Sequence, residues 1–125
     1  MKNPMSKAAK SLQVYGGYTI LFLGLPFLLF PGALLPLVGM AAPTDVWVRV
    51  LAMTVLFLGY YYIQAARREL TDLFRWSVQI RFAVPVFFVA FVVLGFAPTV
   101  LIAFSVPDVL FAIWTASALR SAKPA

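Results

Sequence analysis

Two charged residues lie inside strongly apolar stretches of this 125-residue chain, and they are its first candidates for chemistry. Asp108 lies near the middle of the stretch 98–119, and Arg49 is the fourth residue of the stretch 46–66. A carboxylate in apolar surroundings must be protonated, hydrated or paired. An arginine stays charged and holds a carboxylate with two parallel hydrogen bonds, so Arg49 is the expected partner of Asp108.

Aromatic side chains near these charges are further candidates. Three consecutive tyrosines, residues 60–62, are spread about 100° apart around a helix, so at least one of them faces other helices. A tyrosine hydroxyl in apolar surroundings costs free energy unless it is hydrogen-bonded. Residues of the membrane-surface aromatic belt are the alternative interpretation. The predicted polar site consists of Arg49, Asp108, Tyr61 and Trp114.

Other chemistry has few residues to support it. The chain contains no cysteine, no histidine and only four aspartate and glutamate residues. Thiol nucleophiles, disulfides, histidine bases and Cys or His metal ligands are therefore excluded, and no phosphate-binding loop or hydrolase motif is present. The sequence predicts no enzyme, no cofactor and no metal. An acid–base pair that combines Asp108 with a tyrosine or with Arg49 is the remaining catalytic alternative.

The composition identifies the surroundings of these residues. Hydrophobic residues make up 63% of the chain and charged residues 11%, with a mean hydropathy of +0.96. Ordinary soluble domains contain roughly 45–50% apolar and ~25% charged residues. A soluble fold of this length leaves too much of its surface in water to accommodate so much apolar surface. The chain is therefore expected to be an integral membrane protein.

Four stretches are long enough to cross a membrane as helices, because about 20 apolar residues span ~30 Å of hydrocarbon. They are residues 12–30, 46–66, 78–96 and 98–119. We predict an all-α membrane protein whose single domain, residues 1–125, has four transmembrane helices in two antiparallel hairpins. Residue 49 would lie roughly 6 Å, and residue 108 roughly 15 Å, below one membrane surface, a gap that an arginine side chain can bridge.

Three interpretations of these two charges stay open. An Arg49–Asp108 pair could lock the second helix to the fourth. Asp108 could instead belong to a proton or ligand site near the midplane of the membrane. In the third interpretation, Pro107 frees a backbone carbonyl and Asp108 marks a hydrated kink.

Basic residues divide unequally between the two sides of the predicted helices. The formal net charge is +6, and nine of the ten basic residues fall on one side, namely Lys2, Lys7, Lys10, Arg67, Arg68, Arg75, Arg81, Arg120 and Lys123. Basic loops stay in the cytoplasm, which predicts that both termini are cytoplasmic (N-in/C-in). The net charge then reflects orientation and attraction to anionic lipid, and no nucleic-acid partner is expected. A cleaved signal peptide is disfavoured, because its apolar core, residues 14–30, would exceed the usual ~7–15 residues.

The connections between the predicted helices differ in character. Residues 31–45 are apolar and proline-rich, which predicts a short helical turn in the outer interface. Residues 67–77 have the spacing of an amphipathic helix, whose apolar face holds Leu70, Leu73, Phe74 and Ser77. This pattern predicts a segment that lies on the inner membrane surface. A lipid or partner docking strip and a solvated turn are its two interpretations.

Several segments resemble a group of uncharacterised bacterial inner-membrane proteins of about this length. They are DVWVRVLAM (45–53), LGYYYIQAARREL (58–70), WSVQIR (76–81), PDVLFAIWTASALR (107–120) and the LGLPFLLFP stretch of the first helix. The resemblance implies four helices in the bacterial inner (plasma) membrane, and it assigns no activity to any residue.

The scarcity of polar chemistry inside the membrane leads to two functional hypotheses. The first is a non-catalytic membrane protein that acts as an accessory, assembly or lipid-organising subunit, with the lipid bilayer and a homo-oligomer or larger complex as partners. The second is an oligomeric transporter or binder of a small hydrophobic or protonatable ligand at Asp108 and Arg49. A cavity that reaches Asp108 and is lined by residues 60–62 or Trp114 would favour the second hypothesis, and a packed helix interface there would favour the first.

Overall fold

The computed structural model describes residues 5–121, and all of its regular elements are helical. Four helical stretches are long and apolar enough to cross a membrane, namely Lys7–Leu29, Trp47–Arg67, Thr71–Val93 and Val100–Ser121. The predicted all-α class with four spans is therefore confirmed. Lys2 and Lys123, which the charge count includes, lie outside the described residues.

The first span consists of three continuous segments, namely α1 (Lys7–Tyr18), the π-helical η1 (Thr19–Gly24) and α2 (Leu25–Leu29). Pro26 accounts for the wider turn, because proline has no N–H to donate to the carbonyl four residues earlier. The N–H of Leu25 instead donates to the carbonyl of Ile20. A π-turn adds one residue to the helix, which rotates the following side chains by about 100°.

Short helices follow the first span. They are α3 (Pro31–Leu34) and the 3₁₀-helix η2 (Pro36–Val38), and each begins with proline, whose missing N–H is not needed at that position. The chain leaves η2 through Gly39, whose φ of 82° favours glycine. The helical turn predicted within residues 31–45 is confirmed.

The other three spans are α4 (Trp47–Arg67), α5 (Thr71–Val93) and α6 (Val100–Ser121). The prediction for α5 is wrong at its start, because residues 71–77 form the first turns of this helix instead of a segment on the membrane surface. Only residues 68–70 connect α4 to α5. The reason is burial: Phe74 and Ser77, on the face of these first turns that points into the bundle, are buried within the chain, whereas Leu70 is 49% exposed.

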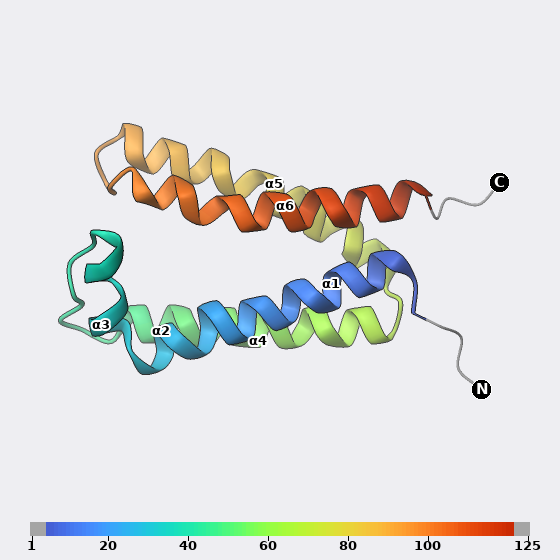
Figure 1. Cartoon of the computed structure of the whole chain (residues 1–125), viewed down its shortest axis with the longest axis horizontal. Coiled ribbons are helices and arrows are strands. Elements are labelled where there is room, and N and C mark those ends of the chain that lie inside the picture. Colours follow the sequence, from blue (N-terminus) through green and yellow to red (C-terminus); the bar gives the residue numbers. More distant parts are fainter. Residues whose placement is uncertain (1–4, 122–125) are drawn as a thin grey trace.

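The helices lie side by side along one long axis (Figure 1). Helix α1 packs between α4 and α6, α5 packs on α6, and α4 and α5 scarcely touch. The start of α1, the turn between α4 and α5 and the end of α6 lie at one end of the molecule (Figure 1). We call it the basic end, because its exposed basic residues are Lys7, Lys10, Arg67, Arg68, Arg75 and Arg120.

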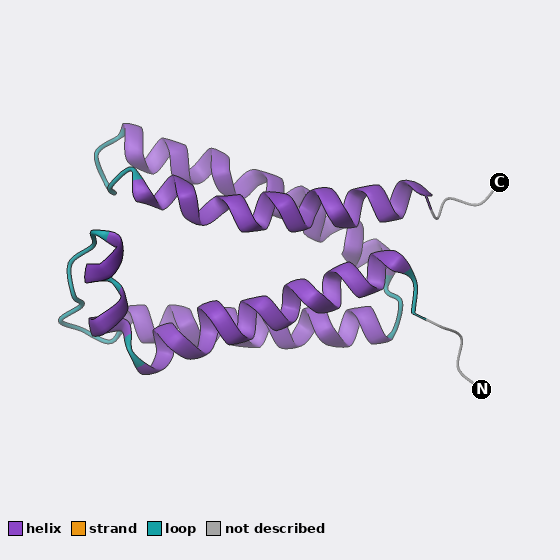
Figure 2. Cartoon of the chain, viewed as in Figure 1, coloured by secondary structure: helices purple, strands orange, loops and turns teal. Residues whose placement is uncertain are grey.

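The opposite end, which we call the far end, carries α3, η2 and the connection from α5 to α6 (Figure 1). Figure 2 shows that the loops are confined to the two ends. The principal core cluster lies in the half of the bundle nearer the basic end. Its buried members are Ala8, Ala9, Leu12, Tyr15, Tyr62, Ala65, Ala66, Phe74 and Ala118.

A carboxylate fastens the start of α1 to the turn between α4 and α5. The backbone N–H and the hydroxyl of Ser6 donate to the two carboxylate oxygens of Glu69, at 2.8 and 2.7 Å. Ser6 is also the N-cap of α1, and its Oγ accepts from the N–H of Ala9 at 3.1 Å. The arrangement completes a capping box in which Glu69 supplies the carboxylate from the turn between α4 and α5, since position N3 is Ala9.

Two glycines bring the backbones of α1 and α4 into contact. A Cβ atom added at Gly16 would lie 2.9 Å from the carbonyl oxygen of Gly59. A Cβ atom added at Gly59 would lie 2.6 Å from the side chain of Ile20. Any larger residue at either position would push the two helices apart.

Candidate functional site

The two charges predicted to pair inside the membrane do not meet. Nη1 of Arg49 donates to the carbonyl oxygen of Leu28 at 2.6 Å. Asp108 accepts a hydrogen bond from the hydroxyl of Tyr15 at 2.7 Å. Neither charge forms an ion pair within residues 5–121. The predicted lock between the second and fourth spans is wrong, because α1 lies between α4 and α6.

The other two residues of the predicted site also lie apart from this hydrogen bond. Tyr61 is 64% exposed on α4, and Trp114 is exposed on α6, stacked on Phe111 at a centroid distance of 6.2 Å. The expectation that one of the three tyrosines faces other helices is confirmed by Tyr62, which is 7% exposed. The structure thus does not gather Arg49, Asp108, Tyr61 and Trp114 into one site.

A buried arginine lies at the centre of the polar residues that the structure does gather. Arg81 is 1% exposed and lies ten residues after the start of α5, about 15 Å along the helix. Its Nε donates to the carbonyl oxygen of Ser77 at 3.2 Å, and its Nη2 donates to Ser77 Oγ at 2.9 Å. Its Nη1 is buried and has no hydrogen-bond partner among residues 5–121.

Arg81 was predicted at the inner end of the third span, because the apolar stretch begins at residue 78. One signal could have corrected this. Phe74, Ser77 and Arg81 follow the spacing i, i+3 and i+7, which places all three on the same helical face. Extending the helix back to Thr71 turns that face into a buried stripe, with Arg81 near the middle of the span.

Tyr15 connects the two opposite charges. The Arg81 Cζ atom lies 4.5 Å from the centroid of the Tyr15 ring, a cation–π distance, and the hydroxyl at the other side of that ring donates to Asp108 Oδ1. The ring also packs against Tyr62 at a centroid distance of 5.3 Å. We call Tyr15, Tyr62, Ser77, Arg81 and Asp108 the polar cluster. Both of its charges contact the Tyr15 side chain in a low-dielectric interior, where Coulomb interactions reach further than in water.

A second polar contact joins α1 to α6 nearer the basic end. The hydroxyl oxygens of Ser11 and Thr115 lie 2.6 Å apart, and both residues are fully buried. Ser11 Oγ also lies 2.7 Å from the carbonyl oxygen of Ala8, to which it donates. These contacts hold α1 against α6 on the side of the polar cluster that faces the basic end.

An apolar crevice of about 300 Å³ reaches Asp108 on the side of the far end. Asp108 is its only ionisable lining residue; the others are Leu23, Phe27, Leu35, Met40, Val48, Leu51, Ala52, Val55, Phe88, Leu101 and Phe104. We call this space the Asp108 crevice. The crevice reaches Asp108, as the ligand hypothesis requires, but neither residues 60–62 nor Trp114, the lining which that hypothesis names, line it. Its volume lies at the lower end of the range of small-molecule sites, about 300–1,000 Å³.

The π-turn in the first span determines which residues line this crevice. In a regular α-helix, Phe27 would be rotated by about 120° from Tyr15, twelve residues earlier. The extra residue of η1 reduces that rotation to about 20°. Tyr15, in the polar cluster, and Phe27, in the crevice wall, therefore lie on the same face of the first span.

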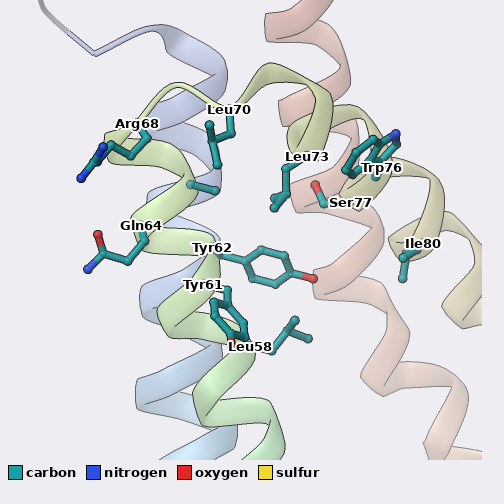
Figure 3. A pocket seen from close by; sticks show the side chains of 11 residues that line it. Leu58, Tyr61, Tyr62, Gln64, Arg68, Leu70, Leu73, Trp76, Ser77 and Ile80 are labelled. Atoms are coloured by element: carbon teal, nitrogen blue, oxygen red, sulfur yellow. The ribbon is translucent and has the colours of Figure 1, made fainter.

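A larger groove of about 540 Å³ lies between α4 and α5, nearer the basic end. Its lining residues are Leu58, Tyr61, Tyr62, Gln64, Ala65, Arg68, Leu70, Leu73, Trp76, Ser77 and Ile80. Figure 3 shows the ring of Tyr62 extending from α4 into the space beside Ser77, whereas Arg68 and Gln64 point outward at the edge. We call this space the α4–α5 groove.

Residues 5–121 contain no group of three or more His, Cys, Asp or Glu side chains that could hold a metal ion. Comparisons of the chain with protein-family models, curated proteins and solved structures find no match. The resemblance to small bacterial inner-membrane proteins therefore stays a prediction. What the comparisons and the geometry establish together is a small all-helical chain with four helices able to span a membrane.

Proposed function

We propose that this chain is a non-catalytic membrane protein that binds a small amphipathic molecule within the bilayer, with a protonated nitrogen of the ligand at Asp108. The observation that carries the proposal is a single carboxylate at the end of an otherwise apolar crevice. The apolar walls favour a hydrophobic body. The carboxylate favours a cationic donor, since charge-assisted hydrogen bonds are about twice as strong as neutral ones.

The surroundings of Asp108 support a cationic ligand in two ways. Asp108 accepts one hydrogen bond within the described residues, whereas a carboxylate offers about four acceptor positions. Three phenylalanines, Phe27, Phe88 and Phe104, line the same crevice, and aromatic faces attract organic cations. On the other side, the hydrogen bond from Tyr15 holds the carboxylate in place, so the site is preorganised for a donor that arrives through the crevice.

Calorimetric titration of the purified full-length protein in a mild detergent tests this proposal. The probes are decylamine and decanol, which have the same chain and differ in the cationic group. We expect decylamine to bind wild type and Asp108→Asn to weaken that binding about ten- to hundredfold, the equivalent of a charged hydrogen bond. The asparagine still offers Tyr15 an acceptor, so the fold is retained. Arg49→Gln is the control and leaves decylamine affinity unchanged.

Two results would contradict the proposal. One is equal affinity of wild type for decylamine and decanol, which would remove the role of charge. The other is unchanged binding of decylamine to Asp108→Asn, which would place the amine elsewhere.

A second candidate function is an accessory, assembly or lipid-organising subunit, and the exposure of α5 favours it. Of 23 residues in this helix, only Phe74, Ser77 and Arg81 are buried within the chain. Val86 and Val93, farther along, are 69% and 77% exposed. Native mass spectrometry after extraction in a gentle detergent separates the candidates. A defined homo-oligomer or heteromeric complex supports the subunit role, and a monomer without bound protein contradicts its assembly form.

We further propose two antiparallel hairpins, with both termini in the cytoplasm of a bacterial cell and the spans in its inner membrane. The support is the charge bias. Arg81 is buried within the bundle and no longer counts, but eight of the ten basic residues remain on the predicted cytoplasmic side. Reporter fusions after Ala125 and within residues 39–44 test the orientation. A cytoplasmic signal from the second fusion would reverse it.

A further inference from the structure

We infer a second binding site that does not involve Asp108: the α4–α5 groove holds an acyl chain of one anionic phospholipid, whose phosphate lies beside Arg67 and Arg68 at the basic end. Three independent features lead to this assignment. They are the apolar walls of the groove, its length along the membrane normal and the charge at its end.

The walls of the groove require an apolar occupant. Leu58, Leu70 and Ile80 line it and are 43%, 49% and 61% exposed. Helices α4 and α5 scarcely touch, so the groove opens sideways between two spans toward the hydrocarbon of the bilayer. Most of the exposed wall is apolar, although Tyr62 and Ser77 also line the groove, so an apolar chain covers more of this surface favourably than water does. An acyl chain from the surrounding leaflet reaches the groove without leaving the hydrocarbon.

The length of the groove matches one leaflet. On the α4 side the lining residues run from Leu58 to Arg68, just past the end of α4, and on the α5 side from Leu70, just before α5, to Ile80. Each range covers ten residues of rise, or about 15 Å. This is half of the ~30 Å hydrocarbon core. A lipid of the leaflet at the basic end therefore fits with its chain in the groove and its headgroup at the level of Arg68.

The charge at this end selects an anionic headgroup. Arg67 and Arg68 are exposed, and neither has a hydrogen bond or ion pair to a side chain within residues 5–121. The nearby carboxylate of Glu69 is turned toward Ser6 and bonded to it. Figure 3 shows the Arg68 guanidinium pointing outward from the groove edge, where a phosphate would lie. Trp76, exposed at the same level, is of a residue type that prefers the headgroup region.

Tryptophan quenching by brominated lipid tests the site directly. A Trp47→Phe, Trp114→Phe variant retains Trp76 as its one tryptophan, inside the groove wall. It is reconstituted in phosphatidylcholine vesicles that contain a minor fraction of either phosphatidylglycerol or phosphatidylcholine brominated on the acyl chain. We expect several-fold stronger quenching by brominated phosphatidylglycerol, because the anionic lipid is enriched at the groove. Equal quenching by the two lipids would overturn the inference.

Two substitutions in this background separate a site from general surface charge. Arg68→Gln is expected to lower the apparent affinity for phosphatidylglycerol about fivefold, the effect of one basic residue near a membrane surface. Arg120→Gln removes the same charge at the same end, outside the groove, and is expected to leave the affinity unchanged. Equal losses in both variants would show a diffuse surface potential and overturn the site.

A third substitution tests the position of the acyl chain. Leu58→Phe narrows the groove from α4 and is expected to reduce the quenching of Trp76 by phosphatidylglycerol. Val86→Phe, on an exposed face of α5 outside the groove, is the matched control. Unchanged quenching in Leu58→Phe would place the chain elsewhere. Asp108→Asn should retain the preference for phosphatidylglycerol, so a failure of this inference is distinguishable from a failure of amine binding.

Discussion

The two halves of this bundle are packed differently, although both consist of the same four spans. In the half nearer the basic end, the buried residues are mostly small, namely Ala8, Ala9, Ser11, Ala65, Ala66 and Ala118. Hydroxyl contacts such as Ser11 with Thr115 cross between the helices there. In the half nearer the far end, leucine and phenylalanine side chains line a crevice between the helix pairs.

The difference follows from what holds helices together in a membrane. Lipid tails are as apolar as leucine, so burying a leucine between helices gains little, and association relies on close packing and interhelical hydrogen bonds. Small residues permit the close approach, and polar residues supply the bonds. The far half has fewer of both, which leaves room for a ligand beside Asp108.

The largest expected effect comes from breaking the close approach of α1 and α4. Gly16→Ala places a methyl group 2.9 Å from the carbonyl oxygen of Gly59, so we expect a loss of about 1–3 kcal/mol of unfolding free energy. Unfolding by titration with a denaturing detergent measures it. Gly17→Ala is the matched control, since a Cβ atom there has no neighbour within 4 Å, and it should be neutral or stabilising. Equal losses would deny that packing against α4 is the cause.

A double-mutant cycle measures the strength of the hydrogen bond between Tyr15 and Asp108, which lies at the boundary between the two halves. Tyr15→Phe and Asp108→Ala should be coupled by about 0.6–1.7 kcal/mol, the range for hydrogen bonds between membrane helices. Arg49→Gln and Asp108→Ala should instead be additive within about 0.5 kcal/mol, because Arg49 bonds to Leu28. Thermal unfolding of the single and double variants in detergent provides both values. Coupling of Arg49 with Asp108 would restore the pair that the structure excludes.

The smallest effect concerns the hydrogen bonds between Ser6 and Glu69 at the basic end. Glu69→Gln leaves one acceptor for Ser6 and removes the charge, so a loss below about 1 kcal/mol is expected in the same unfolding assay. Asp72→Asn removes a carboxylate three residues farther along the chain, one that forms only an exposed pair with Arg75, and no measurable change is expected. A larger loss of stability in Asp72→Asn than in Glu69→Gln would contradict a stabilising role of the hydrogen bonds between Ser6 and Glu69.

Composition and hydropathy were sufficient to predict the four spans, because their signal is the length of apolar stretches and requires no knowledge of partners. The start of α5 was mispredicted for the same reason. A hydropathy average places the edge of the span at Arg75 and Arg81. The helix accommodates Arg81 because its guanidinium donates to Ser77 and lies over the Tyr15 ring. Such partners lie on other turns and other helices, and a linear average does not include them.

The candidate site was predicted in part. Asp108 is identified by its position alone, since a carboxylate within a membrane span costs free energy whichever direction its side chain takes. Its partner was mispredicted because pairing by depth ignores which helices are neighbours. Tyr15 lies near the start of the first apolar stretch, 12–30, where its position alone indicates no partner, and only the packing order α4, α1, α6 brings it to Asp108. The π-turn that aligns Phe27 with Tyr15 has its cause in Pro26, but a proline alone does not reveal the register it produces.

Amine binding at Asp108 requires an open path from the far end to the carboxylate, and covalent labelling measures that path directly. A hydrophobic carbodiimide, which adds to carboxyl groups from within a bilayer, is applied to vesicles containing the protein, and the labelled site is located by peptide mass spectrometry. The chain has only four Asp and Glu side chains to distinguish. We predict selective labelling of Asp108, reduced when Leu101→Trp fills the crevice. Absence of label on Asp108, with the exposed Asp45 and Asp72 still open to a water-soluble carbodiimide, would contradict the account.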